Sequence, residues 1–191
     1  QSVVDKKTGK NVFSADDGTP TPLFFAHLAG LQRYLPAAMA LFAPNVNSYR
    51  RITRFQVAPI NVQWGYDNRT AGLRVPMSEP QSRRVENRIS GADANPYLAT
   101  AASLACGYLG MVQGLSPTEP ITGSAHDLPF SLPRNLDEAI RLLRGEIVRS
   151  SPARILEELY KILRQGRAQR TFEMLHAYGL LAYLLPEADR A

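Results

Sequence analysis

Residues 83–105 read RRVENRISGADANPYLATAASLA, a strand-like pattern that leads directly into a helix start. In the first part of this stretch, the alternation of side chains would place Arg84, Glu86 and Arg88 on one face of a strand. Two arginines that flank a carboxylate on one strand face predict a polar site at this position.

Two apolar helices are predicted, one after this strand and one near the N-terminus. Asn95 and Pro96 form an N-cap and first-turn pair, and the small and apolar residues that follow predict a buried, closely packed helix to about Gln113. The Thr-Pro pair at residues 21–22 begins the other helix, in which apolar residues recur at helical spacing until Pro36. These apolar residues are Phe24, Leu28, Leu31 and Leu35.

Further strands are predicted before residue 83. Residues 56–66 and 72–75 are rich in strand-forming residues, with Asp67, Asn68 and Arg69 as the connecting turn. With the strand that follows, they predict antiparallel strands packed against helices, which is an α+β fold.

Positive charge is concentrated between residues 50 and 88. This segment holds eight arginines, three acidic residues and no lysine, and the net charge of the whole chain is +5. Guanidinium groups form paired hydrogen bonds with phosphate and carboxylate groups, so the segment predicts binding of such an anion. A solvated charged surface is the alternative interpretation. The arginines are Arg50, Arg51, Arg54, Arg69, Arg74, Arg83, Arg84 and Arg88.

The composition, with 45% hydrophobic and 20% charged residues, is that of a globular protein. No stretch reaches the roughly 18–20 apolar residues of a membrane span, and the N-terminal residues are too polar for a signal peptide. A cytoplasmic protein without a membrane partner is therefore expected. The single cysteine, Cys106, cannot form an internal disulfide and lies in a run of small residues, which predicts a packing role. His27 is expected to be structural.

Four motifs within residues 1 to about 143 resemble the catalytic domain of the glutamine synthetase family. They are NVNSYRR at 45–51, WGYDNRTAGLRVP at 64–76, RRVENR at 83–88 and GADANPYLATAASLA at 91–105, in the order and spacing of that family. The resemblance implies the C-terminal half of the domain. It also implies an ATP-dependent ligase that joins the side-chain carboxylate of glutamate to an amine through γ-glutamyl phosphate. The members that glutamylate polyamines are the most similar.

The resemblance further implies roles for five residues. Arg51 would bind the glutamate carboxylate, Arg69 and Arg74 the nucleotide phosphates, and Arg88 the transferring phosphoryl group as a catalytic residue. Glu86 would be a ligand of Mg²⁺ or Mn²⁺. These roles fit the chemistry, because phosphoryl transfer requires positive charge near the phosphoryl oxygens and a carboxylate to hold the metal.

Two departures from the family limit the implied activity. Members that use ammonia have a glutamate six residues after the substrate-binding arginine, where this chain has Val57, and this argues against ammonia as the preferred amine. The other metal-binding glutamates, the metal-binding histidine and the N-terminal domain of the family lie upstream of the matched motifs. Because a metal needs several oxygen ligands, the isolated chain is expected to be inactive or severely impaired. A missing N-terminal half or the subunits of a homo-oligomer would have to complete the site.

The C-terminal part predicts an all-α helical hairpin. Asn135 caps a short helix that would end at Gly145, Ser151 opens another that reaches Gly166, and a last helix ends at Gly179. Residues from about 144 to 191 resemble the helical region that follows the catalytic head in bacterial poly(A) polymerases and tRNA nucleotidyltransferases. The likeness is carried by residues 150–159 and 179–186. With nine basic and eight acidic residues, the segment 136–191 has little electrostatic attraction to RNA.

The predicted organisation is a partial glutamine-synthetase-like catalytic domain over residues 1–135 and a helical segment over 136–191, with a change of family between Asp137 and Glu146. Three interpretations of function stay open. The chain could retain part of the glutamate and nucleotide site of a ligase. Its helical segment could instead bind RNA, or the chain could be a fragment without activity whose exposed apolar surface needs a partner.

Overall fold

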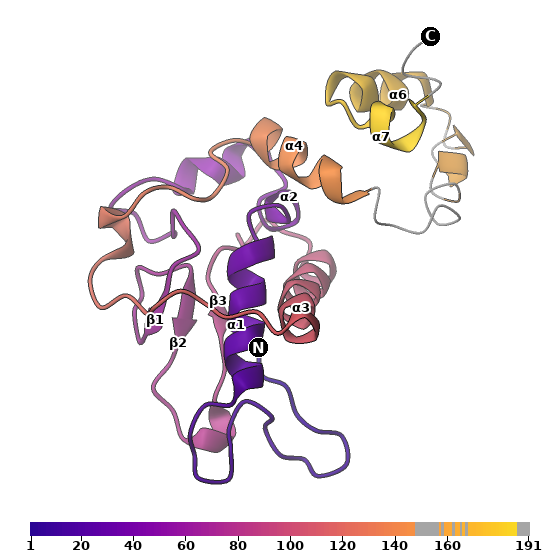
Figure 1. Cartoon of the computed structure of the whole chain (residues 1–191). Helices are drawn as coiled ribbons and strands as arrows, with labels where there is room; N and C mark the ends of the chain where they lie inside the picture. The colour runs from indigo at the N-terminus through magenta and orange to yellow at the C-terminus, as the bar shows by residue number, and fades with distance from the viewer. Residues whose placement is uncertain (148–156, 158, 162, 165, 167, 187–191) are drawn as a thin grey trace. The chain divides into compact units, whose positions relative to one another are not determined.

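The computed structural model describes residues 1–147, 157, 159–161, 163–164, 166 and 168–186, and the chain divides into two compact units, Gln1–Leu136 and Asp137–Ala191 (Figure 1). The helices are α1 (Pro22–Tyr34), α2 (Met39–Phe42), α3 (Pro96–Gln113), α4 (Leu136–Ile147), α6 (Ala168–Ala177) and α7 (Leu181–Leu184). The strands are β1 (Trp64–Tyr66), β2 (Leu73–Val75) and β3 (Glu86–Asn87). Three short 3₁₀ helices are η1 (Val46–Arg51), η2 (Pro80–Ser82) and η3 (Ala125–Asp127).

The core of the first unit is built on α1 and α3, which lie side by side (Figure 1). Both helices begin where the sequence predicts. The hydroxyl of Thr21 accepts a hydrogen bond from the Phe24 backbone, and the Asn95 side chain accepts two from the first turn of α3. α3 ends at Gly114, whose φ of 60° is the left-handed conformation common at helix C-termini.

The two helices approach each other closely at Gly30 of α1 and Gly110 of α3. A Cβ atom placed on Gly30 would lie 2.7 Å from the Gly110 Cα, and one placed on Gly110 would lie 2.5 Å from the Gly30 Cα. Both distances are well below van der Waals contact, so neither position has room for a side chain. On the same helix as Gly30, Leu28 and Leu31 have no exposed surface. The backbones of α1 and α3 therefore pack directly against each other.

Much of the remaining surface of α3 exposes apolar side chains. The helix has no charged residue among its 18 positions. Six of its large hydrophobic residues are 40–84% exposed. They are Tyr97, Leu98, Leu104, Tyr108, Leu109 and Val112. Because a helix that is apolar all round is normally buried on all sides, the described residues of the first unit leave part of α3 uncovered.

The strands form a small mixed sheet in the order β1–β2–β3. β2 and β3 are antiparallel, with Arg74 opposite Glu86, whereas β1 and β2 are parallel, with Gly65 beside Arg74. The prediction of antiparallel strands is wrong for β1 and β2. Instead of forming a tight hairpin, residues 67–72 carry the chain back to the level at which β1 began.

The strands are also shorter than predicted. Of residues 56–66 only the last three form a strand, and of residues 83–90 only two do. Outside β1, backbone groups of this region pair with a distant loop. The carbonyl of Ile60 accepts hydrogen bonds from the backbone N–H groups of Ser131 and Leu132, at 3.2 and 3.3 Å. Loop contacts thus take the place of a longer ladder.

In the second unit, α4 continues through Gly145 to Ile147, so the predicted end of this helix at Gly145 is wrong. A glycine within a helix costs only about 1 kcal/mol, which neighbouring residues can outweigh.

The predicted helix over 151–166 lies largely outside the described residues, although positions 157, 159–161 and 163–164 are helical. As predicted, a helix is followed by a turn at Gly179 and one more apolar helical turn, and these last two helices, α6 and α7, contact each other.

Cys106 and His27 are both buried in the first unit, in agreement with their predicted packing roles. Burial raises the pKa of the Cys106 thiol to about 12, so it remains protonated at neutral pH. The His27 Nε2 atom lies 2.9 Å from the Gln1 Oε1 atom. Among the helices of the described residues, none combines the length and apolar character required to cross a membrane.

Replacement of Gly110 by alanine is expected to lower the free energy of unfolding of the first unit by about 1–3 kcal/mol, because the added methyl group would force α1 and α3 apart. Gly123→Ala is the matched control, since a Cβ at Gly123 would meet no atom within 4 Å. Urea unfolding followed by circular dichroism measures the difference. Equal midpoints for the two variants would contradict direct backbone packing.

The stability of the first unit should fall when the pH is lowered through the range in which His27 titrates. Burial, followed by the nearby N-terminal charge, lowers the pKa of His27 from 6.5 to about 4. The unfolded chain thus binds a proton near pH 6.5 that the folded chain resists until about pH 4. The stabilisation is complete above pH 6.5, and on the order of 2–3 kcal/mol is lost by about pH 4.5.

Titration of the His27 ring by NMR measures this pKa directly. The His176 ring, in the second unit, serves as an internal comparison in the same sample. A pKa near 6.5 for His27 would show that its ring is not held neutral by burial.

Candidate functional site

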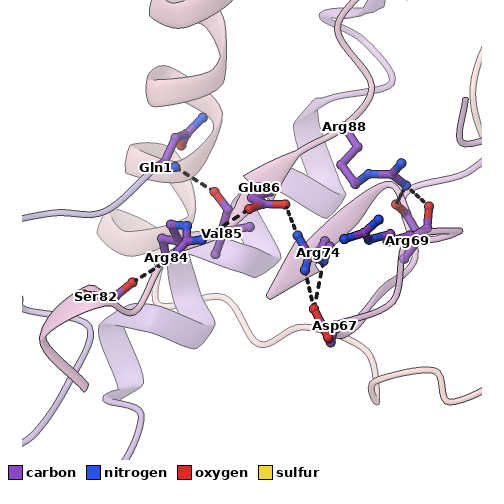
Figure 2. Close-up of polar contacts among 10 residues, drawn as sticks. Gln1, Asp67, Arg69, Arg74, Ser82, Arg84, Val85, Glu86 and Arg88 are labelled. Atoms are coloured by element: carbon purple, nitrogen blue, oxygen red, sulfur yellow. Dashed lines mark hydrogen bonds and ion pairs between the residues drawn. The ribbon is translucent and has the colours of Figure 1, made fainter. Parts of the chain in front are cut away.

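Arg74, at the centre of β2, is held by two carboxylates (Figure 2). Its Nη1 atom donates to the Glu86 Oε2 atom at 2.8 Å, and its Nε atom donates to the Asp67 Oδ1 atom at 3.1 Å, while Nη2 also donates to Asp67. The strand register explains the first contact, because Arg74 and Glu86 are opposite each other in the antiparallel ladder. Hydrogen bonds to Asp67 and then to Glu86 raise the pKa of Arg74 above its usual value.

Glu86 has a second arginine on its other side. The Arg84 Nη2 atom lies 3.6 Å from the Glu86 Oε1 atom. The predicted sharing of one strand face by Arg84 and Glu86 agrees with this contact, although only Glu86 lies within β3. The four side chains of Asp67, Arg74, Arg84 and Glu86 form a cluster in which two positive and two negative charges balance.

Arg88 turns toward a different segment (Figure 2). Its Nη1 atom donates to the backbone carbonyl of Arg69 and, at 3.3 Å, to that of Ala71. Burial, together with the positive charge of Arg74, lowers the pKa of Arg88. The Arg69 side chain itself is exposed. Arg88 therefore binds main-chain oxygens and keeps a full positive charge that none of its hydrogen-bond partners neutralises.

Arg51 and Arg88 line the same open depression, which has a volume of about 440 Å³. Arg51 is the last residue of η1, and its Nη2 atom donates to the backbone carbonyl of Ile89. Val57 lies at the rim of this depression and is 84% exposed. Two arginines that are 37 positions apart in the sequence are thus brought to one surface hollow, beside an apolar side chain.

A second depression of about 550 Å³ has Glu86 and Asn87 in its wall and shares residues 90–92 with the first. The balanced cluster around Glu86 and the depression of Arg51 and Arg88 are therefore neighbours. Of the five residues predicted to form the site, Arg74 and Glu86 are paired directly and Arg51 and Arg88 share a cavity. Arg69 is joined to this group through its backbone carbonyl.

Glu86 does not form a metal site with the other described residues. Within the described ranges there is no group of three or more histidine, cysteine, aspartate or glutamate residues that could hold a metal ion. The charged partners of Glu86 are Arg74 and Arg84, which favour its carboxylate as an ion-pair partner. A divalent ion at Glu86 would therefore need oxygen ligands from elsewhere, since Mg²⁺ prefers six.

Asp67 is a member of the cluster that the sequence pattern did not single out. The sequence predicts a turn at this residue, and Asp67 does follow β1 with a φ of 50°, which is unusual for a residue other than glycine. The signal that could have identified it is the run Asp67–Asn68–Arg69, in which an acidic residue interrupts an otherwise basic segment.

A further hollow has a volume of about 650 Å³. Its wall contains Phe25, Trp64 and Tyr66 together with Pro117 and Pro120, so it is mainly apolar. None of the residues predicted from the sequence to form the site lines it. Size alone therefore does not identify the polar site.

Comparisons with known proteins relate this chain to a single family. The family described as "Glutamine synthetase, catalytic domain" matches residues 1–161. The chain is 42% identical over 127 residues to "Gamma-glutamylputrescine synthetase PuuA" of Escherichia coli (strain K12), which covers 65% of this chain and 27% of that protein. It is 33% identical over 187 residues to "Type-1 glutamine synthetase 2" of Dictyostelium discoideum, which covers 93% of this chain and 36% of that protein.

A solved structure, "GmaS/ADP complex-Conformation 1", superimposes with a TM-score of 0.62 and 31% sequence identity, covering 73% of this chain and 34% of that one. The chain thus spans roughly a third of the length of these relatives.

The family match extends beyond the predicted change of family between Asp137 and Glu146. The match continues to residue 161, and the alignment with the Dictyostelium protein covers nearly the whole chain. Residues 150–159, which carried the likeness to poly(A) polymerases, therefore lie inside the range matched by the glutamine synthetase family. These matches show that the chain belongs to the glutamine synthetase family and contains part of its catalytic domain.

Proposed function

We propose that this chain carries the glutamate-binding and phosphoryl-transfer part of an ATP-dependent glutamate–amine ligase. The observation that carries the proposal is the presence of Arg51 and Arg88 in one depression, next to the ion-pair cluster of Arg74 and Glu86. The family assignment supports it, and so does the name of the relative from Escherichia coli.

The reaction has two steps. An oxygen of the glutamate side-chain carboxylate attacks the terminal phosphorus of ATP, and the bond from that phosphorus to the bridging oxygen breaks, which releases ADP. The amine nitrogen then attacks the acyl carbon of γ-glutamyl phosphate, loses a proton and expels phosphate. In this scheme Arg51 binds glutamate through its carboxylate, and Arg88 neutralises the negative charge on the phosphoryl group during transfer.

Arg69 and Arg74 are the proposed ligands of the nucleotide phosphates. Arg69 is exposed, so its guanidinium is accessible to ATP. The Nε, Nη1 and Nη2 atoms of Arg74 already donate to carboxylates, so a phosphate would compete with Asp67 and Glu86 for this side chain. The related structure described as an ADP complex supports the use of ATP.

The metal proposed for this reaction, Mg²⁺ or Mn²⁺, would take Glu86 as one ligand and other ligands from outside the described residues. The chain spans roughly a third of its relatives, which leaves room for those ligands in the rest of a catalytic domain or in another subunit of a homo-oligomer. We therefore propose that the chain by itself binds substrates but turns them over slowly or not at all.

Val57 supports an alkyl amine as the second substrate. An exposed apolar side chain beside Arg51 offers no charge to attract ammonium, whereas it can contact the methylene groups of a larger amine. A polyamine such as the putrescine named for the Escherichia coli relative fits this surface. A cytoplasmic location is part of the same proposal, and RNA is not, because residues 136–191 carry almost no net charge.

Calorimetric titration with Mg-ATP should detect binding to the intact chain, and both Arg88→Ala and Arg74→Ala should weaken it by about 10-fold or more, because each removes a hydrogen bond to a charged group. Arg33→Ala is the matched control, since it removes the same charge from an exposed position in the last turn of α1.

Absence of binding at millimolar ATP would leave the family membership intact and overturn the proposed nucleotide site. Equal weakening by Arg33→Ala would also contradict it, because that result would reflect the net charge of the protein and not a specific site.

A further inference from the structure

Asp93 links two segments that carry the arginines of the depression. Its Oδ2 atom accepts hydrogen bonds from the Ser48 hydroxyl and, at 3.3 Å, from the Asn45 side-chain amide. Ser48 is buried, and its hydroxyl also accepts a hydrogen bond from the Asn45 backbone N–H at 3.0 Å. The Asp93 carboxylate thus holds the start of η1 against the loop between β3 and α3.

Arg51, at the other end of η1, packs against the same loop. Its guanidinium donates to the Ile89 carbonyl. A Cβ atom placed on Gly91 would lie 3.2 Å from the Arg51 Nε atom and 3.3 Å from its Nη2 atom, so the guanidinium lies directly against the loop backbone. Nε is buried and has no hydrogen-bond partner among the described residues. The position of this side chain is therefore set by how closely η1 and the loop are held together.

Other contacts also join these two parts of the chain. The backbone N–H of Gly91 donates to the Phe42 carbonyl at 3.0 Å, which fixes the loop to the end of α2. η1 and the residue before it are joined to the loop by the hydrogen bonds of Asp93 to Ser48 and Asn45 and by that of Arg51 to Ile89. Hydrogen bonds to a charged carboxylate are stronger than neutral ones, so those of Asp93 contribute to the restraint on η1.

The opposite charges of Asp93 and Arg51 also favour holding η1 against the loop. Burial lowers the pKa of Arg51, and the negative charge of Asp93 opposes this effect. Reciprocally, the hydrogen bond from Ser48, followed by other contacts that include the charge of Arg51, lowers the pKa of Asp93. The carboxylate therefore stays ionised at neutral pH beside a guanidinium that has lost part of its hydration.

We infer that Asp93 is a positioning residue for Arg51: through Ser48 and Asn45 it holds η1 so that the Arg51 guanidinium lies in the depression that Arg88 also lines. This inference rests on the proposed function in one respect, since the ligand assigned to Arg51 there is the carboxylate of glutamate. A purely structural role, as part of the turn before the N-cap of α3, is the competing explanation.

The test compares Asp93→Ala, Asp93→Asn and Ser48→Ala with wild type in the intact chain. Two properties are measured: the affinity for L-glutamate by calorimetry, and the NMR signal of the Arg51 Nε–H group, assigned by its loss in Arg51→Lys. The control is Asp127→Ala, which removes an exposed carboxylate at the end of η3.

Asp93→Ala and Ser48→Ala should weaken L-glutamate binding by about 10-fold and shift the Arg51 signal, with an unfolding temperature close to that of wild type. Asp93→Asn keeps an acceptor for Ser48 and should recover part of both effects. Asp127→Ala should change neither.

An unchanged Arg51 signal and unchanged affinity in Asp93→Ala would overturn the inference. A lower unfolding temperature with an unshifted Arg51 signal would likewise overturn it in favour of the structural role. If wild type does not bind L-glutamate but the Arg51 signal responds to Asp93, the proposed ligand of Arg51 is wrong and the positioning role stands.

Discussion

The first unit depends on direct contact between the backbones of α1 and α3. Gly30 and Gly110 allow the two helices to meet without intervening side chains, and the Ala26 carbonyl also lies against Gly110. Since Asn95 caps α3, the loop that precedes it is fixed relative to the core. Arg88 and residues 90–92 of the depression belong to the segment that leads into α3, so the helix pair helps to determine where this part of the polar site lies.

The arginines of the site fall into two electrostatic groups. Arg74 and Arg84 contact carboxylates, and the cluster that they form with Asp67 and Glu86 has no net charge. Arg51 and Arg88 instead donate to main-chain carbonyls, which orient a guanidinium without cancelling its charge. This difference explains why the anion-binding role is better supported for the second group, although both groups come from the same basic segment of the sequence.

Helix starts and the list of candidate arginines could be predicted from the sequence because both depend on local signals. Thr21 and Asn95 act as caps within their own turns, and the basic segment is visible as composition. Strand direction could not be predicted in this way. The parallel pairing of β1 with β2 depends on where residues 67–72 return, and the lengths of the strands depend on hydrogen bonds to residues 121–132. The roles of Asp67 and Asp93 could not be predicted either, because their partners come from other segments. Asp67 contacts Arg74, which also contacts Glu86, and Asp93 contacts Ser48 of η1.

The helix pair at the centre of this unit is made from segments that are far apart along the chain. Roughly 60 residues separate the end of α1 from the start of α3. During synthesis at about 5–20 residues per second, α1 therefore waits for roughly 3–12 seconds before α3 exists to cover its apolar face. Folding of the first unit cannot be completed by local contacts alone, because the chain must close this long loop before the two glycines can meet. A nascent chain that stops before residue 96 lacks the helix whose Gly107 and Gly110 lie against His27 and Gly30, so that face of α1 stays open to water and to association with other chains.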